Sequence, residues 1–162
     1  MRPPYITRTF DPADSPVLAD IHRRAILAIS PRFYSRAELA SWAHGLDPAR
    51  HARMAEEGAT YCVAVNSDGE IQGFASSRPD GPDGRVLAIF VDPDAQGQGI
   101  GGALLQTVEQ DLIALSPRRL IIGASLSAVA FYEAHGYQVT ARRLHGTRGG
   151  LEIAMRDMEK TL

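Results

Sequence analysis

The chain has 162 residues, of which 44% are hydrophobic and 22% charged, a balance typical of an ordinary globular protein with one domain. Its formal net charge of −2 argues against a nucleic-acid binder, and its single cysteine excludes an intrachain disulfide and a cysteine zinc cluster. No window of 18 apolar residues exists, and the N-terminus lacks the apolar stretch of a secretory signal. We therefore expect a cytoplasmic protein with neither a membrane nor a nucleic-acid partner.

The first third of the chain predicts one strand followed by helices. Residues 5–10 alternate as in a short strand. From Asp14 to Ile29, apolar side chains recur at the i, i+4 spacing of one buried helix face, and Pro31 ends this pattern. Ser35-Arg36-Ala37-Glu38 has the pattern of a capping box, so a second helix is expected to begin there. A third, short helix is expected over 47–57.

The middle of the chain predicts a hairpin, a loop and a buried strand. Strands are expected over 59–66 and 70–77, because the turn sequence Asn66-Ser67-Asp68-Gly69 separates them. Residues 79–84, which contain only Pro, Asp and Gly, predict an exposed loop without regular structure. The run 86–91 is apolar throughout, as in a central strand that is covered on both faces.

The last third predicts alternating helices and strands. A glycine-rich turn, Gln96-Gly97-Gln98-Gly99-Ile100-Gly101-Gly102, leads into an amphipathic helix. After it we expect a strand over 120–122, a helix over 127–135 that Gly136 ends, and strands over 137–144 and 151–158. This order of elements predicts one mixed α/β domain over residues 1–162.

The glycine-rich turn is a candidate anion site. Glycines let the backbone approach a ligand closely, and the first amides of a helix have no partner inside the helix. The helix dipole adds about half a positive charge at the same place. A phosphate or pyrophosphate therefore fits such a turn without a basic side chain. A tight turn that binds no ligand is the simpler interpretation.

Two other phosphate motifs compare less well with this turn. A P-loop requires a Lys that the turn lacks. The dinucleotide pattern Gly-x-Gly-x-x-Gly is met by Gly97, Gly99 and Gly102, but four residues, 92–95, separate it from the strand. No acidic residue occurs over 118–122, where that motif places one.

Two sequence blocks resemble the GNAT superfamily of N-acetyltransferases. Val91-Asp92-Pro93, followed by the segment 96–101, is similar to the coenzyme A-binding motif of that family, and the segment 125–137 is similar to its block that ends in Phe-Tyr-Glu-x-x-Gly-Phe. The last strand, around 150–155, also resembles that of bacterial members. The resemblance implies a mixed, mostly antiparallel sheet that is splayed in the middle and flanked by helices, in a single N-acetyltransferase domain.

The resemblance also implies how acetyl-CoA is held. The amides of Gly97, Gln98, Gly99, Ile100, Gly101 and Gly102 would bind its pyrophosphate, and Gln96 would brace the turn. The exposed backbone of Ile89, Phe90 and Val91 would pair with the pantetheine arm, and an amide there would hold the oxyanion that develops from the thioester. Ser125 stands where many members have an Asn that bonds the pantetheine.

For the chemistry, Tyr132 matches the family tyrosine that protonates the departing CoA thiolate, although half-buried packing would explain a tyrosine there as well. Phe33, Tyr34 and Trp42 are the candidate aromatics of an acceptor pocket, with ordinary helix packing as the alternative. The acceptor would be a small-molecule amine or a protein amine. A homodimer is expected by analogy with bacterial members of similar length.

The sequence shows no general base. The stretches 85–91 and 120–123 contain no carboxylate. His22, His44 and Glu38 lie in the helical region where the family builds its acceptor pocket, but each is expected to be a polar surface residue. A water chain is an alternative acceptor for the proton. The five histidines have no metal-ligand spacing, and Cys62 is expected to be an inert buried thiol. Two rival functions remain: a non-catalytic CoA-binding or sensing module on the same fold, and a dinucleotide-binding oxidoreductase.

Overall fold

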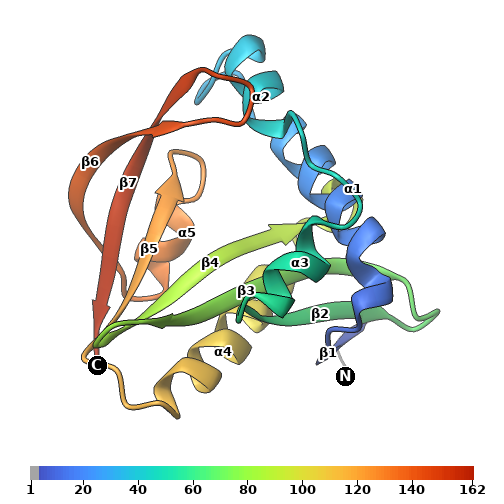
Figure 1. Cartoon of the computed structure of the whole chain (residues 1–162), viewed down its shortest axis with the longest axis vertical. Helices are drawn as coiled ribbons and strands as arrows, with labels where there is room; N and C mark the ends of the chain where they lie inside the picture. The colour runs from blue at the N-terminus through green and yellow to red at the C-terminus, as the bar shows by residue number, and fades with distance from the viewer. Residues whose placement is uncertain (1–3) are drawn as a thin grey trace.

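The computed structural model describes residues 4–162, and its centre is a sheet of seven strands in the order β1-β2-β3-β4-β5-β7-β6 (Figure 1). The strands are β1 (Tyr5–Thr9), β2 (Thr60–Asn66), β3 (Ile71–Asp80), β4 (Asp83–Val91), β5 (Arg119–Ser125), β6 (Gln138–Gly146) and β7 (Glu152–Thr161). All neighbouring strands are antiparallel except β4 and β5, which are parallel. The expected mixed, mostly antiparallel sheet is thus confirmed.

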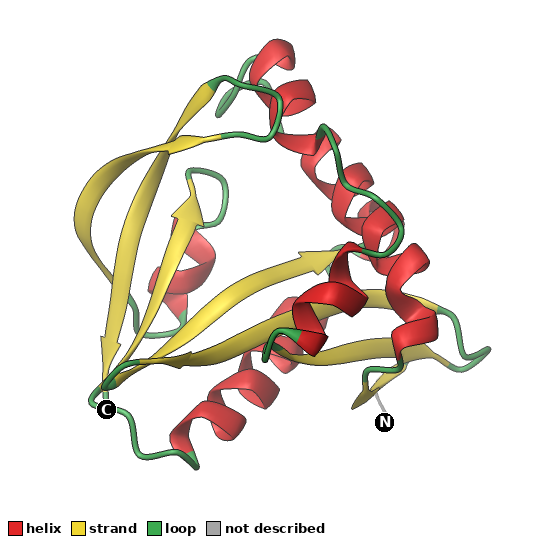
Figure 2. Ribbon diagram, in the orientation of Figure 1, coloured by secondary structure: helices red, strands yellow, loops and turns green. Residues whose placement is uncertain are grey.

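Helices cover both faces of this sheet (Figure 2). They are α1 (Ser15–Leu27), α2 (Arg36–Ala43), α3 (Arg50–Glu56), α4 (Ile100–Ile113) and α5 (Val129–Ala134). The alternation of side chains along β2 shows how the faces divide: Ala64 packs in the cluster that contains Leu104 of α4, whereas Val63 packs with Leu18 of α1. Two separate hydrophobic layers therefore hold β2–β4 between α1 and α4.

The sheet is splayed between its two parallel strands. β4 pairs with β5 only near its start, through Gly84 with Leu120 and Arg85 with Ile121. Beyond these pairs the strands diverge (Figure 2). The prediction that 86–91 is covered on both faces is consequently wrong in part: Val86 is buried, but residues 87–91 are only half-buried, because a cavity opens beside them.

The expected loop over 79–84 is also wrong. Asp80 pairs with Asp83 across a turn of two residues, so that β3 and β4 form one continuous hairpin. Gly81 has φ +57°, which suits the first position of such a tight turn. Asp83 is buried, and its carboxylate accepts a hydrogen bond from Arg119 Nε at 3.3 Å. Pairing with β5 therefore extends the strands into a segment whose composition favours a loop.

The hairpin of β6 and β7 reaches from the sheet to α2 (Figure 1). Its loop docks there, since Gly149 N donates to Ser41 O at 2.9 Å. A Cβ at position 149 would lie only 2.6 Å from Ser41 Oγ, so the close approach requires glycine. This contact closes a ring of elements around the cavity beside β4. None of the helices in the described residues combines the length and the apolar character needed to cross a bilayer.

Candidate functional site

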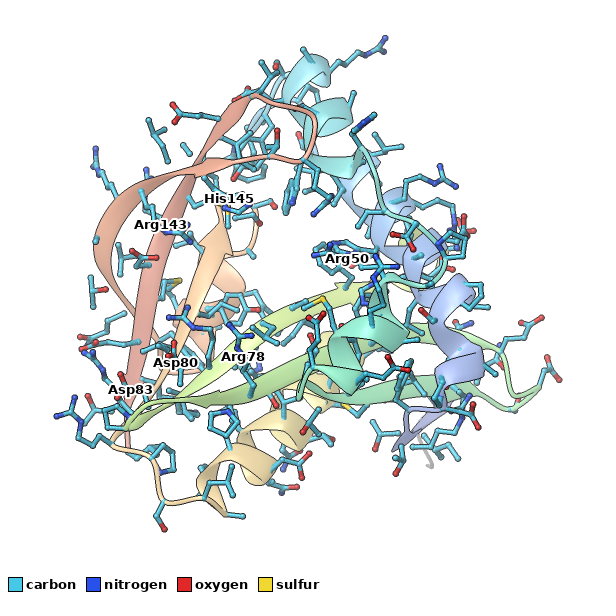
Figure 3. The ribbon with its side chains drawn as sticks, viewed as in Figure 1. Arg50, Arg78, Asp80, Asp83, Arg143 and His145 are labelled. Carbon is cyan, nitrogen blue, oxygen red and sulfur yellow. The ribbon has the colours of Figure 1, made fainter. Side chains whose placement is uncertain are left out.

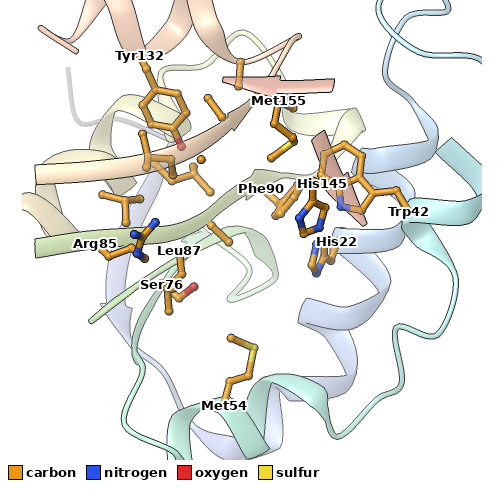
Figure 4. Close-up of a pocket in the computed structure, with 18 of the residues that line it drawn as sticks. His22, Trp42, Met54, Ser76, Arg85, Leu87, Phe90, Tyr132, His145 and Met155 are labelled. Carbon is orange, nitrogen blue, oxygen red and sulfur yellow. The ribbon is translucent and has the colours of Figure 1, made fainter. Parts of the chain in front are cut away.

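A cavity of about 320 Å³ occupies the opening between β4 and β5. Its volume falls in the range of small-molecule sites. Ile89 and Phe90 line it from β4, Ser125 lines it from the end of β5, and Tyr132 lines it from α5 (Figure 4). The splayed sheet thus brings these candidate residues together from segments far apart in the chain.

The glycine-rich turn lies just beyond β4, at the start of α4, and does not line this cavity. Gly97 and Gly99 have φ +79° and +80°, backbone conformations that only glycine adopts easily. None of the amides over 97–102 donates a hydrogen bond to a group within residues 4–162. Ile100 is buried in the main core and anchors the turn, while Gln98 is exposed. This row of unsatisfied N–H groups can donate hydrogen bonds to an anion such as a diphosphate.

Contacts on both sides of the turn hold it in place. Gln96 Nε2 donates to Val91 O at 3.1 Å, which ties the turn to the end of β4. Arg24 of α1 makes an ion pair with Asp92, with 2.7 Å between Nη2 and Oδ2. A Cβ on Gly101 would lie 3.4 Å from the Phe131 ring, so α5 packs close against the first turn of α4. Gly102 faces α5 in the same way, with His135 Nε2 at 3.3 Å from its Cβ position. Gly101 and Gly102 therefore also serve helix packing.

The strand register shows which main-chain groups of β4 face the cavity side. Asp92 N donates to Gln72 O of β3 at 2.8 Å, and by the strand register these two residues lie opposite each other, so theirs is a hydrogen-bonded position of the ladder. Because such pairs alternate along an antiparallel ladder, Phe90 turns its N–H and C=O toward β3, and Ile89 and Val91 turn theirs away. A ligand beside β4 would thus meet the main chain of Ile89 and Val91, but only the side chain of Phe90.

Tyr132 lies at the wall of the cavity, with its ring directed from α5 toward the sheet (Figure 4). The residue is only 4% exposed, and burial raises the pKa of its phenol above the usual range, so the group stays protonated at neutral pH. Its hydroxyl makes no hydrogen bond to any group within residues 4–162, and burial alone acts on its pKa, so its proton is available to a ligand. Ser125 Oγ, also at the cavity, lies 2.9 Å from Ser127 Oγ.

The three candidate acceptor aromatics occupy different places. Trp42 lines the cavity. Tyr34 lies outside the lining: it donates to Ala154 O at 2.6 Å and accepts from Leu126 N at 2.9 Å, which fastens β7 to the segment after β5. Phe33 is half-buried and packs beside the Tyr34 cluster, with the guanidinium of Arg32 5.3 Å from its ring centre.

Two histidines form a buried pair at the cavity. His22 of α1 is 6% exposed and His51 of α3 is 2% exposed, and both line the cavity. His22 was expected at the surface, and that prediction is wrong, because α1 turns this side chain against Phe90, with 4.1 Å between the ring centres. His44 is indeed exposed, and Glu38 is engaged in the capping box with Ser35.

Hydrogen bonds orient the histidine pair. His22 Nδ1 lies 3.4 Å from His51 Nε2, and His51 Nδ1 lies 2.9 Å from the Tyr61 hydroxyl, which donates to Met54 Sδ at 3.6 Å. These contacts allow two directions of donation. If Tyr61 donates to Met54, His51 donates to Tyr61 and His22 Nδ1 donates to His51, which leaves His22 Nε2 unprotonated; if Tyr61 donates to His51 instead, His22 Nε2 carries the proton. No hydrogen bond inside residues 4–162 involves His22 Nε2. His51 has no motif in the sequence, and only the packing of α1 against α3 reveals it.

Burial holds both imidazoles neutral. It lowers the pKa of His22 well below its usual value, assisted by the repulsion that a protonated His51 would exert and by the charges of Arg148 and Arg50. Burial and the same two arginines lower the pKa of His51 to about 4. Both groups are therefore uncharged at neutral pH and can accept a proton. By the same cause, burial raises the pKa of Cys62 to about 11, which makes it an inert thiol.

These pKa values predict that acid destabilises the fold. Above pH 6.5 His51 is neutral in both states, but between 6.5 and about 4 the unfolded state binds the proton and the folded state does not. The free energy of unfolding should therefore fall by about 3 kcal/mol over that window, at 1.36 kcal/mol per pKa unit. Urea unfolding of wild type and His51→Gln at a series of pH values measures this. His44→Gln is the matched exposed control, and an unchanged pH slope in His51→Gln would contradict the assignment.

Comparisons with known proteins agree with this geometry. Residues 31–162 match the profile of the acetyltransferase (GNAT) domain. The chain is 26% identical over 142 residues to YafP of Escherichia coli, described as an uncharacterized N-acetyltransferase. The aligned region covers 88% of this chain and 87% of that protein. A solved GCN5-related N-acetyltransferase from Rhodopseudomonas palustris is 28% identical, with a TM-score of 0.87, over 97% of this chain and 95% of that one.

A second solved structure shares the fold at lower identity. PaiA N-acetyltransferase from Thermoplasma acidophilum, solved in complex with coenzyme A, is 17% identical, with a TM-score of 0.76, over 98% of this chain and 99% of that one. The fold, with its splayed sheet and its glycine turn, is that of an acetyltransferase domain. The chain belongs to the GNAT acetyltransferase family.

Proposed function

We propose that the protein transfers the acetyl group of acetyl-CoA to a primary amine of a small acceptor, by direct attack within a ternary complex. The observation that carries this proposal is the cavity beside β4, which has the protonated hydroxyl of Tyr132 and the neutral imidazole of His22 in its wall. Such a pair can give one proton and take another, as aminolysis of a thioester requires.

The residues of the chain fit coenzyme A along its length. The free amides over 97–102 would hold the diphosphate, with Gln96 and the Arg24–Asp92 ion pair keeping the turn rigid. The main chain of Ile89 and Val91 would pair with the pantetheine, and Ser125 could donate to it from β5. Val91 O is already bonded to Gln96, so the Val91 amide is the group left to hold the thioester oxygen. When bound, acetyl-CoA supplies the activated acetyl group.

The proton steps can then be assigned. The acceptor nitrogen attacks the thioester carbon, so that the C–N bond forms and the C–S bond breaks. His22 Nε2 takes the proton that the nitrogen loses, and Tyr132 gives its proton to the departing sulfur. Negative charge that develops on the carbonyl oxygen would be stabilised by the Val91 amide. His51 and Tyr61 position His22 through the hydrogen bonds described above.

Release of free thiol from acetyl-CoA in the presence of a panel of primary amines tests this function. We expect amine-dependent release by wild type, and we expect His22→Gln to lower kcat by about 100-fold, as loss of a general base does. Binding of acetyl-CoA, measured by calorimetry, should not change in this variant. His44→Gln is the control, since this histidine is exposed and lies outside the cavity lining.

Each other outcome has a distinct meaning. Binding of acetyl-CoA without thiol release for any amine would favour the non-catalytic CoA-binding module. An unchanged kcat in His22→Gln would show that another group accepts the proton. Binding of a nicotinamide dinucleotide in place of acetyl-CoA would favour the oxidoreductase.

A further inference from the structure

The charged residues at the cavity are all basic. Four arginines line it, from α3, β4, β6 and the loop between β6 and β7, and within the described residues no Asp or Glu lines it. The four are Arg50, Arg85, Arg143 and Arg148. Three histidines add to this lining, of which His145 on β6 faces Arg50 across the hollow (Figure 3). A cationic amine with no other charge would meet an unfavourable potential there.

Two of these arginines have carboxylate partners. Arg85 Nε donates to Asp80 Oδ2 at 2.7 Å, and Arg143 Nε donates to Asp157 Oδ1 at 2.9 Å. Both partners lie outside the cavity lining. The charges of Arg85 and Arg143 are therefore balanced by the protein itself, and they need no ligand.

Arg50 and Arg148 are not balanced in this way. Arg50 makes no ion pair or side-chain hydrogen bond within residues 4–162, and its Nε is buried without a partner. Arg148 donates from Nε to His44 O at 2.8 Å and from Nη2 to Trp42 O, both neutral acceptors, which leaves Nη1 free. Burial, and then the charge of Arg50, lower the pKa of Arg148 to about 10. Arg50 and Arg148, both half-buried, thus line the cavity without an ion-pair partner in the described residues; Asp47, which interacts with Arg50 at longer range, makes its ion pair with Arg53.

The same two arginines act on the histidine pair. Their charges contribute to the lowered pKa of both His22 and His51. Arg50 is adjacent to His51 on α3, and both residues line the cavity together with His22 and Arg148. His22 of α1 and His51 of α3 contact each other. The other titratable or charged groups around them are Tyr61 from β2, Arg50 from α3, Asp47 from the loop before α3, and Arg148 from the loop after β6.

We propose that the acceptor is a small amino acid, whose carboxylate binds between Arg50 and Arg148 while its amine lies at His22 Nε2. A carboxylate supplies two acceptor oxygens for two guanidiniums and satisfies the buried Nε of Arg50. The volume of about 320 Å³ suits a small molecule. A protein N-terminus carries no carboxylate beside its amine and does not fit this arrangement. That the bound amino acid is the acetyl acceptor rests on the proposed function, but the anion site itself does not.

Binding of the carboxylate also changes the proton chemistry. Before it binds, the two arginine charges help to keep His22 a weak base. A bound carboxylate neutralises them, so the pKa of His22 rises and the imidazole becomes a better acceptor for the proton of the ammonium. Only an acceptor with the anion would then activate its own base, which provides selection against simple amines.

Kinetics with paired substrates test the assignment. L-amino acids and their α-carboxamides are compared in the thiol-release assay with wild type, Arg50→Gln and Arg53→Gln. We expect at least one amino acid to exceed its carboxamide by about 10-fold or more in kcat/KM, and Arg50→Gln to raise its KM by about 10-fold without affecting the carboxamide. Arg53 is the matched control, because it lies on the same helix, is exposed and pairs with Asp47. A carboxamide, a simple amine or an N-terminal peptide that reacts best would overturn the proposal.

A second measurement needs no catalysis. The imidazole signals of His22 and His51 are followed by NMR, in protein without acetyl-CoA, as N-acetylglycine or N-acetylglycinamide is added. Only the carboxylate should shift these signals and raise the apparent pKa, and Arg50→Gln should abolish the shift. No shift with N-acetylglycine and with free amino acids would refute the anion site, whether or not the enzyme turns over. A shift without turnover would preserve the site and refute only the proposed function.

Discussion

Tyr132→Phe is expected to lower kcat by about 100-fold or more, the lower end of what a general acid contributes. The change removes one oxygen that has no hydrogen bond within residues 4–162, so no other polar group loses a hydrogen-bond partner. The expectation rests on the place of Tyr132 in the wall of the cavity (Figure 4), where its hydroxyl could meet the sulfur of a bound thioester. Steady-state kinetics of thiol release, with calorimetry of acetyl-CoA binding, measure the effect.

A nearby tyrosine provides a matched control for this experiment. Tyr137 packs against Tyr132 with 5.4 Å between the ring centres and is 2% exposed, but it does not line the cavity. Its hydroxyl is buried without a partner, so Tyr137→Phe should preserve kcat. Loss of acetyl-CoA binding in Tyr132→Phe, with kcat at saturation unchanged, would show that Tyr132 is a packing residue.

Gly97→Asp is expected to weaken acetyl-CoA binding by about 100-fold, which corresponds to about 2.7 kcal/mol. A Cβ at position 97 meets nothing within 4 Å, so the side chain fits, and Asp tolerates a positive φ better than most residues. Its negative charge would then face the diphosphate and occupy the approach to the free amides. Calorimetric titration of the variant with acetyl-CoA and with CoA gives the two affinities.

Two variants separate charge and backbone effects in that result. Gly97→Asn has the same shape without the charge and should lose less affinity than Gly97→Asp. Gly69→Asp places the same residue at the same φ of +79° in the turn between β2 and β3, again with nothing within 4 Å of the Cβ. It should bind acetyl-CoA as wild type does. Equal affinity of Gly97→Asp and wild type would refute diphosphate binding at the turn.

Local patterns predicted much of the fold. The capping box at Ser35 forms as expected, with Glu38 N donating to Ser35 Oγ at 3.1 Å. The turn at Asn66 and the left-handed Gly136 after α5 also follow the sequence, because neighbouring residues decide such features. The prediction of a loop over 79–84 was wrong, since the pairing of this segment depends on β5 and on Arg119, which lie far along the chain.

The sequence by itself determined the glycine turn, the tyrosine of α5 and the family, because each depends on residue types at fixed short spacing. Only the tertiary structure decided what surrounds the acceptor. His22, His51, Arg50 and Arg148 come from α1, α3 and the loop after β6, and none carries a motif. Their chemistry arises from packing: burial keeps the imidazoles neutral, and neither Arg50 nor Arg148 has an ion-pair partner within residues 4–162, since Asp47 pairs with Arg53. Burial and charge balance depend on which distant segments meet, and a linear pattern of residues does not record that.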